Sequence, residues 1–203
     1  MKRVETRTLR IDTEVSEQLD ELAERDKISV NVIANQALRK HVEYDAYAEK
    51  FGLVTIPRGL LKTLFSLISD EQARDLGRKS GEHTWVALVT FWFKKFNLEN
   101  VLKSFERVAS RYNRNFEYES SHDGQFLVVI LRHDCGPRAS AFYAEFVKSV
   151  FALLDVKVEL EEAEDQVVAK LFVQKPYEQL TEKGVTPDEL KPPYAQPFPR
   201  QVV

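Results

Sequence analysis

Apolar and polar residues alternate near the start of the chain, over residues 6–11. Leu9 and Ile11 fall on one side of this alternation. The opposite side is polar and consists of Thr6, Thr8 and Arg10. Successive side chains of a β-strand point to opposite faces, so a period of two with β-branched residues is typical of a strand. The pattern therefore predicts a short strand with one apolar face.

Two helical patterns follow this predicted strand. Asp12 or Thr13 offers an N-cap for the first helix, since a side-chain oxygen there can accept a hydrogen bond from a free backbone N–H of the first turn. The apolar residues of that helix recur at helical spacing: Val15, Leu19, Leu22 and Ala23. The pattern breaks at Asp26-Lys27, and Ser29 is the N-cap of a second helix that runs to about Lys50. Its apolar positions are Val32, Ile33, Ala37, Leu38 and Val42.

One strand and two helices cannot bury these apolar faces alone. Even a two-stranded ribbon is marginal in water, and here the partner strand is missing. A second copy of the chain solves the problem if two strands pair antiparallel around a two-fold axis above four interlocking helices. The first 50 residues are therefore predicted to fold as a homodimer.

Residues 3–45 resemble the ribbon-helix-helix family of DNA-binding proteins, the Arc/MetJ-type repressors. The matching segments are RTLRID, TEVSEQLDELAER and ISVNVIANQALRKHV. The resemblance implies that the paired strands enter the major groove and that their outward side chains contact bases. By position, the base-contacting residues would be Thr6, Thr8 and Arg10.

The same resemblance implies contacts to the DNA backbone. The N-terminus of a helix carries unpaired N–H groups and partial positive charge, which suit a phosphate. By position this places phosphate at Ser29, Val30 and Asn31, with further backbone contacts from Lys2, Arg3 and Arg7. One departure from the family is Lys27, which stands where a glycine is common.

The rest of the chain predicts an α+β domain over residues 53–175. Pro57 opens a helix, Asp70 caps a short helix that ends at Gly81, and a very apolar helix begins at Glu82 or His83 and should be buried. A further helix covers 98–112. The period then changes, and strands and one helix are expected at 116–120, 126–131, 140–154, 156–160 and 167–173. This order predicts a four-stranded antiparallel ββαββ sheet, followed by a Pro-rich tail over 176–203.

The charge distribution changes how the first unit is interpreted. The net charge of the chain is −3, which by itself argues against a protein that coats nucleic acid. Residues 1–10, however, contain four basic residues and one acid, a local charge of +3. Residues 11–26 contain seven acids and one arginine, a local charge of −6. A basic tip beside an acidic helix favours a specific DNA reader over a general coat.

Composition bounds the class of protein. The chain has 203 residues, 43% of them hydrophobic, as in globular proteins. The longest near-continuous apolar run, WVALVTFWF, is too short to span a membrane, and the N-terminus lacks a signal core. The single cysteine, Cys135, excludes an internal disulfide. A cytoplasmic location is expected.

Three residues are candidate metal ligands: His122, His133 and Cys135. His and Cys side chains bind soft metal ions, but these residues do not form a recognised set of ligands. The paired histidines that precede the cysteine in ribbon-helix-helix nickel regulators are absent. No metal site or cofactor is therefore predicted, and a metal or small-molecule effector is left open. Cys135 as a redox switch is also left open.

The sequence gives no support for an enzyme. Seven glycines leave no phosphate-binding loop, and no nucleophile with a base stands out. Four aromatic residues either belong to the core or line an effector pocket: Trp85, Trp92, Phe126 and Phe142. The ββαββ order resembles that of small-molecule-sensing domains of regulators, including 4-vinyl-reductase-like domains, in element order only.

These observations predict a homodimeric, sequence-specific transcriptional regulator of the repressor type, with assembly into tetramers left open. The second domain would add dimer contacts or sense an effector. Three alternatives remain at this point. One is a dimeric scaffold or toxin-neutralising protein whose ribbon serves autoregulation. The second is an effector-sensing module whose ligand lies against the aromatic helix, and the third is a dimerisation element that has lost DNA contact.

Overall fold

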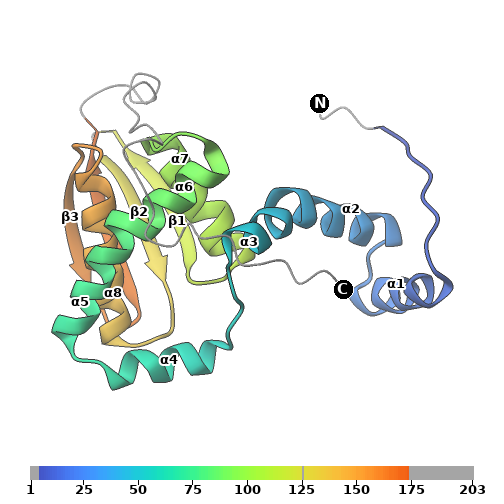
Figure 1. Cartoon of the computed structure of the whole chain (residues 1–203), viewed down its shortest axis with the longest axis horizontal. Coiled ribbons are helices and arrows are strands. Elements are labelled where there is room, and N and C mark those ends of the chain that lie inside the picture. The colour runs from blue at the N-terminus through green and yellow to red at the C-terminus, as the bar shows by residue number, and fades with distance from the viewer. Residues whose placement is uncertain (1–4, 125, 174–203) are drawn as a thin grey trace. The chain divides into compact units, whose positions relative to one another are not determined.

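The computed structural model describes residues 5–124 and 126–173 of the chain. The chain divides into two compact units, Met1–Lys50 and Phe51–Val203, and each is considered by itself (Figure 1). The predicted phosphate contacts Lys2 and Arg3 and the predicted tail at 176–203 lie outside the described residues. No helix within the described residues is long and apolar enough to cross a bilayer.

The first unit contains the two predicted helices. α1 spans Thr13–Asp26, and α2 spans Val30–Lys40. A π-helical segment, η1 (His41–Asp45), continues α2 into α3 (Ala46–Phe51). Asp12 occupies the N-cap of α1 with an extended backbone and no side-chain cap bond. The predicted boundary between the helices is confirmed.

The strand expected over residues 6–11 is not formed in the single chain. Residues 5–12 carry no helix or strand assignment and lead as a plain trace into α1 (Figure 1). A strand exists through hydrogen bonds to a neighbour, and the neighbour that the sequence predicts belongs to a second copy. The prediction of an N-terminal ribbon therefore has no counterpart within one chain.

The second unit begins with helices. α4 spans Arg58–Leu67. α5 (Asp70–Lys79) continues through the π-helical η2 (Ser80–Trp85) into α6 (Val86–Phe93). α7 (Leu98–Lys103) continues through the π-helical η3 (Ser104–Tyr112). The apolar helix is buried as predicted, at Val86, Leu88, Val89 and Trp92.

The predicted helix end at Gly81 is wrong. Gly81 lies inside η2, and its role is close packing rather than termination. A Cβ at Gly81 would lie 2.8 Å from the carbonyl oxygen of Phe146, and a Cβ at Gly77 would lie 2.9 Å from the carbonyl carbon of Phe142. The two glycines, four residues apart, let this helix approach the backbone of a neighbouring helix, α8 (Pro137–Ala152).

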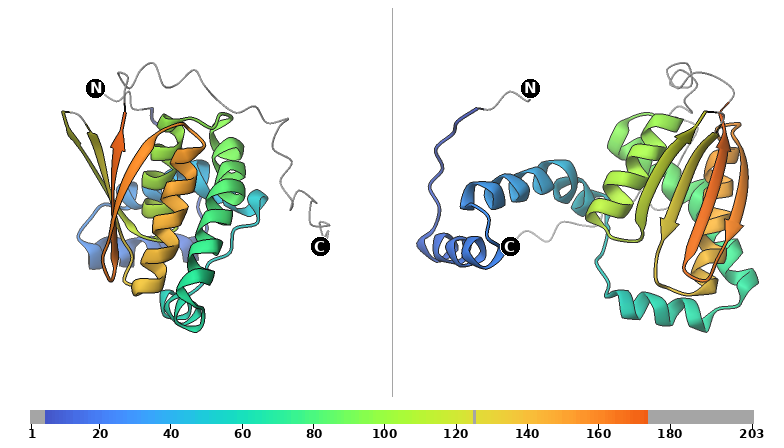
Figure 2. Two further views of the ribbon diagram at one scale, coloured as in Figure 1. Left: turned by 90° about the vertical axis from the view of Figure 1, so that its left-hand side faces the viewer. Right: turned by 180° about the vertical axis from the view of Figure 1, so that it is seen from behind.

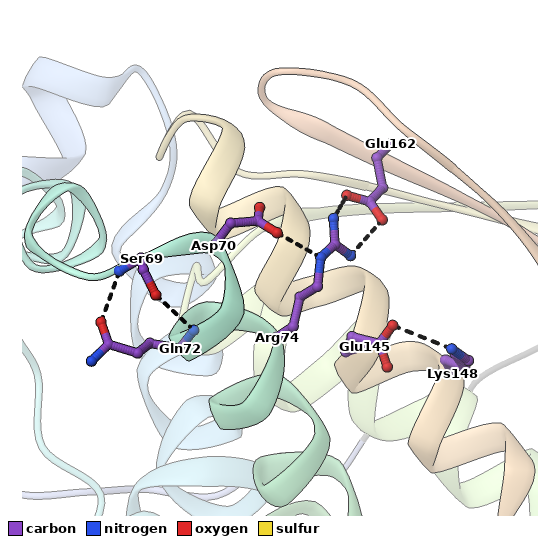
Figure 3. Close-up of polar contacts among 7 residues, drawn as sticks. All are labelled: Ser69, Asp70, Gln72, Arg74, Glu145, Lys148 and Glu162. Atoms are coloured by element: carbon purple, nitrogen blue, oxygen red, sulfur yellow. Dashed lines mark hydrogen bonds and ion pairs between the residues drawn. The ribbon is translucent and has the colours of Figure 1, made fainter.

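The N-cap of α5 is also one residue earlier than predicted. Ser69, not Asp70, caps the helix (Figure 3). Its Oγ accepts from the Gln72 N–H at 3.1 Å, while Gln72 Oε1 accepts from the Ser69 N–H at 2.8 Å, which forms a capping box. One turn further, both terminal nitrogens of Arg74 donate to Glu162 at 2.8 Å. These bonds tie α5 to the sheet and raise the pKa of Arg74.

The predicted ββαββ unit is confirmed. β1 spans Glu117–Asp123, β2 spans Phe126–Arg132, β3 spans Lys157–Glu162 and β4 spans Gln166–Phe172. They form one antiparallel sheet of four strands in the order β1-β2-β4-β3. α8 connects β2 to β3, so the unit is α+β.

The helices of this unit cover one face of the sheet (Figure 2). Across β2 and β4, Val129 lies opposite Ala169 and Leu131 opposite Val167, and all four side chains are buried. The aromatic centre of the core is Phe105, which is fully buried. The strands and helices of the second unit therefore share one core.

Candidate nucleic-acid interface

The predicted base-contacting residues are free to meet a partner. Thr6, Thr8 and Arg10 are all exposed. In the described part of the chain Arg10 forms no ion pair, whereas Arg7 pairs with Glu5 at 3.0 Å. A guanidinium without a carboxylate partner retains all its donors for a guanine edge or a phosphate. The structure thus leaves Arg10 available and partly neutralises Arg7.

The N-terminus of α2 has the features of an anion site. Ser29 Oγ accepts from the Val32 N–H at 3.3 Å, which confirms Ser29 as the N-cap. The first N–H groups of a helix, here those of Val30 and Asn31, have no carbonyl partner within the helix. The Asn31 side chain is engaged locally, because its Oδ1 accepts from Asn35 Nδ2 at 3.0 Å. Backbone donors are therefore the groups that this site offers a phosphate.

Lys27 closes the turn between α1 and α2 in a left-handed conformation, with φ of 54°. Its N–H donates to the carbonyl oxygen of Ala23, and the Ile28 N–H donates to the same oxygen at 3.1 Å. Left-handed backbone is easiest for glycine, which explains why glycine is common at such a turn. The lysine adopts the same turn, so this departure does not alter the connection between the helices.

The apolar faces of the first unit are only partly covered in the single chain. Both α1 and α2 lie wholly within the described residues, and neither contains a buried residue. Leu9 is 60% exposed, Leu38 is 52% exposed and Val42 is 63% exposed. Buried side chains first appear at Tyr44 in η1 and Ala48 in α3. The two amphipathic helices therefore leave part of their apolar surface exposed within one chain.

His133 is fully buried and belongs to a structural network. Its Nδ1 accepts from the Cys135 N–H at 3.2 Å, so the ring proton sits on Nε2, 3.0 Å from Ser140 Oγ. Ser140 in turn donates to the carbonyl oxygen of Glu164 at 3.1 Å. Burial lowers the pKa of His133 and keeps the ring neutral. Both ring nitrogens are occupied, so the ring has no lone pair left for a metal.

The other two candidate ligands do not join it. His122 is exposed on β1, whereas Cys135 is buried and its pKa is raised by that burial. A raised pKa disfavours the thiolate that binds metals and reacts with oxidants. Within residues 5–124 and 126–173, no group of three His, Cys, Asp or Glu side chains is arranged to hold a metal ion.

Two of the four aromatic candidates for an effector pocket, Trp85 and Phe142, share the ring partner Phe146, whereas Trp92 and Phe126 pack against other rings. Trp85 packs against Phe146 at 5.2 Å between ring centroids, and its Nε1 donates to Ser104 Oγ at 3.1 Å. Trp92 is buried and contacts Phe51 at 5.8 Å. These two tryptophans are therefore core residues.

The two phenylalanines are half-buried. Phe126 contacts Phe172 on the neighbouring strand β4 at 5.1 Å, and Phe142 contacts Phe65 of α4 at 5.4 Å. Phe126 thus belongs to the sheet and Phe142 to the contact between α4 and α8. The ring contacts do not gather the four candidates around one space.

No local pattern in the sequence singles out Arg58, yet it organises the end of β2. Its Nη2 donates to the carbonyl oxygen of Arg114 at 2.8 Å, and its Nη1 donates to that of His133 at 3.3 Å. Asp134 Oδ2 lies 3.5 Å from Nη1. These partners are more than 50 residues away in the chain, so only the tertiary fold reveals them.

Comparison with protein-family models, curated proteins and solved structures finds no match to this chain.

Proposed function

We propose that this chain is a sequence-specific DNA-binding transcriptional regulator that acts as a homodimer. Two N-terminal segments pair as an antiparallel ribbon, enter the major groove and present Thr6, Thr8 and Arg10 to base edges. The N-terminus of each α2 binds a phosphate beside the ribbon. In this proposal the complete ribbon-helix-helix fold forms only in the dimer.

The observation that carries the proposal is the absence of any buried residue in α1 and α2. Leu9 and Ile11 share one side of the segment that precedes α1, and both are exposed. A second copy would cover these residues together with the exposed apolar residues of the helices. The same pairing would place two basic N-terminal segments side by side, which is what a phosphate-lined groove requires.

The requirement for a dimer can be tested with Leu38→Glu. A charge at a buried apolar contact between copies is costly, so the variant is expected to be monomeric at micromolar concentration and to lose DNA binding. Sedimentation velocity of the full chain measures the first effect and fluorescence anisotropy with duplex DNA the second.

Gln36→Glu is the matched control, because it adds the same charge at an exposed polar position of the same helix. It should remain dimeric. The proposal would be refuted if the wild-type chain sediments as a 23.5 kDa monomer and if the wild type and Leu38→Glu bind duplex DNA equally well.

A further inference from the structure

α4 in the second unit has two apolar rows, of which one is exposed. The inner row includes Phe65, which is buried against Phe142 of α8. The outer row consists of Leu60, Leu64 and Leu67, which are 48%, 47% and 76% exposed. Spacings of four and three residues place the outer row on one face of the helix. Within its own unit, α4 therefore buries only part of its apolar surface.

The segment before the helix also exposes aliphatic side chains. Val54 is 79% exposed and Ile56 is 42% exposed, so five aliphatic side chains are uncovered over residues 54–67. Together the five side chains expose apolar surface on the order of a few hundred Å², and exposed apolar surface of this size often marks an interaction site. We call these five residues the α4 stripe.

The short segment between α3 and α4 determines which partner the α4 stripe encounters most often. Only residues 52–57 separate α3 from α4, and six residues span at most about 20 Å. If two first units pair, as proposed above, each chain holds its α4 within this reach of the dimer. Such a short tether gives two copies of the stripe a mutual effective concentration on the order of millimolar.

We propose that the α4 stripe packs against the same stripe of a second copy of the chain, with the two α4 helices antiparallel across the two-fold axis. In this arrangement Leu64 lies near its own counterpart and Leu60 lies near Leu67 of the partner. An isologous contact needs a self-complementary surface, and an uncharged apolar row meets that need without like-charge repulsion. The proposal rests on the dimer of the proposed function.

The size of the α4 stripe explains why the contact would be secondary. A stable stand-alone interface buries about 800 Å² on each partner, which is more than the five aliphatic side chains of the stripe supply. The stripe would therefore add stability to a dimer that the first units already hold together. It would also limit the freedom of the two second units relative to each other.

Cysteine cross-linking of the full chain tests this inference. Leu60→Cys, Leu64→Cys and Leu67→Cys are each oxidised with copper phenanthroline and run on a non-reducing gel. Lys62→Cys is the matched control, because it is exposed on the polar side of the same helix. The wild-type chain gives the background from Cys135, which is buried. We expect Leu64→Cys to form a disulfide-linked dimer at least ~10-fold faster than Lys62→Cys, since a disulfide needs Cα atoms within about 7 Å.

A second measurement does not depend on register. Leu64→Gln should raise the dissociation constant of the full-chain dimer about 10-fold, whereas Ser66→Gln on the polar side should leave it unchanged. If the wild-type chain is dimeric but no cysteine of the row exceeds Lys62→Cys and Leu64→Gln has no effect, the α4 contact is refuted while the proposed function stands. A monomeric wild-type chain refutes both.

Discussion

Arg10 is exposed, belongs to the polar side of the N-terminal alternation and has no ion-pair partner in the described residues. Its guanidinium can donate two parallel hydrogen bonds to guanine, which alanine cannot replace. We expect Arg10→Ala to weaken specific DNA binding by about 1–3 kcal/mol, or roughly 5- to 150-fold, and to leave the unfolding midpoint unchanged. Fluorescence anisotropy with specific and scrambled duplexes measures the effect.

Arg107→Ala is the control for Arg10→Ala, because it removes the same charge at an exposed position of η3 in the second unit. It should bind specific DNA as the wild type does. Equal losses for both variants would show that only net charge matters and would contradict a reading role for Arg10.

His133 is predicted to make the stability of the second unit depend on pH. Its pKa is lowered by burial, so the unfolded chain takes up the proton first as the pH falls through the ordinary value of 6.5. The free energy of unfolding should then fall below pH 6.5 by up to about 1.4 kcal/mol per pH unit, until the folded-state pKa is reached. Asp165 and Asp134 oppose this shift and Arg58 adds to it.

Urea unfolding followed by tryptophan fluorescence measures this dependence, because both tryptophans, Trp85 and Trp92, lie in the second unit. His133→Gln should be less stable at neutral pH but should lack this part of the pH dependence. The exposed His83, changed to glutamine, should leave the dependence as in the wild type. An unchanged pH profile in His133→Gln would contradict the assignment.

At the scale of elements, the contact between α5–η2 and α8 depends on two glycines. Gly77→Ala and Gly81→Ala would each force a methyl group against the backbone of α8 at Phe142 or Phe146. We expect each to destabilise the second unit by about 1–3 kcal/mol, as overpacking does. Urea unfolding at neutral pH gives the difference.

Gly59→Ala provides the contrast for these two substitutions. Gly59 lies in α4, and a methyl group at this position would meet no neighbouring side chain or packed backbone within 4 Å. Alanine should stabilise the helix by about 0.5–1 kcal/mol, because it loses less backbone freedom than glycine on folding. Destabilisation by Gly59→Ala equal to that of Gly81→Ala would contradict the assignment of the Gly81→Ala effect to close packing against α8.

Elements were predictable from the sequence wherever a local period determines them. The alternation before Asp123-Gly124 and the apolar run after it gave the β1–β2 hairpin, and the Ser29 cap gave the start of α2. The prediction that a helix ends at Gly81 is wrong because the sequence alone does not distinguish a glycine that ends a helix from one that permits close packing against a neighbouring helix, here α8. The partners of Arg58 and the Glu164 carbonyl that completes the His133 network come from distant segments, so no local pattern contained them.

At the scale of the whole molecule, the net charge of −3 conceals two opposed segments. The basic residues precede α1, and the acids of residues 11–26 are almost all within it. In the proposed dimer, the basic segments meet DNA while the acidic residues of α1 oppose binding in any other orientation. In this proposal the ribbon is an element that a single chain cannot form, because its hydrogen-bond partner would belong to a second copy.

Selection from a library of randomised DNA duplexes tests whether the proposed homodimer recognises a particular DNA sequence. The full-length wild-type chain and Arg10→Ala are each incubated with the library, and bound duplexes are sequenced over successive rounds. A symmetric dimer reads two half-sites, so the wild type is predicted to enrich a palindromic or directly repeated motif, and Arg10→Ala is predicted to lose discrimination at particular positions in it. Failure of the folded, dimeric wild-type chain to enrich any motif would contradict the account.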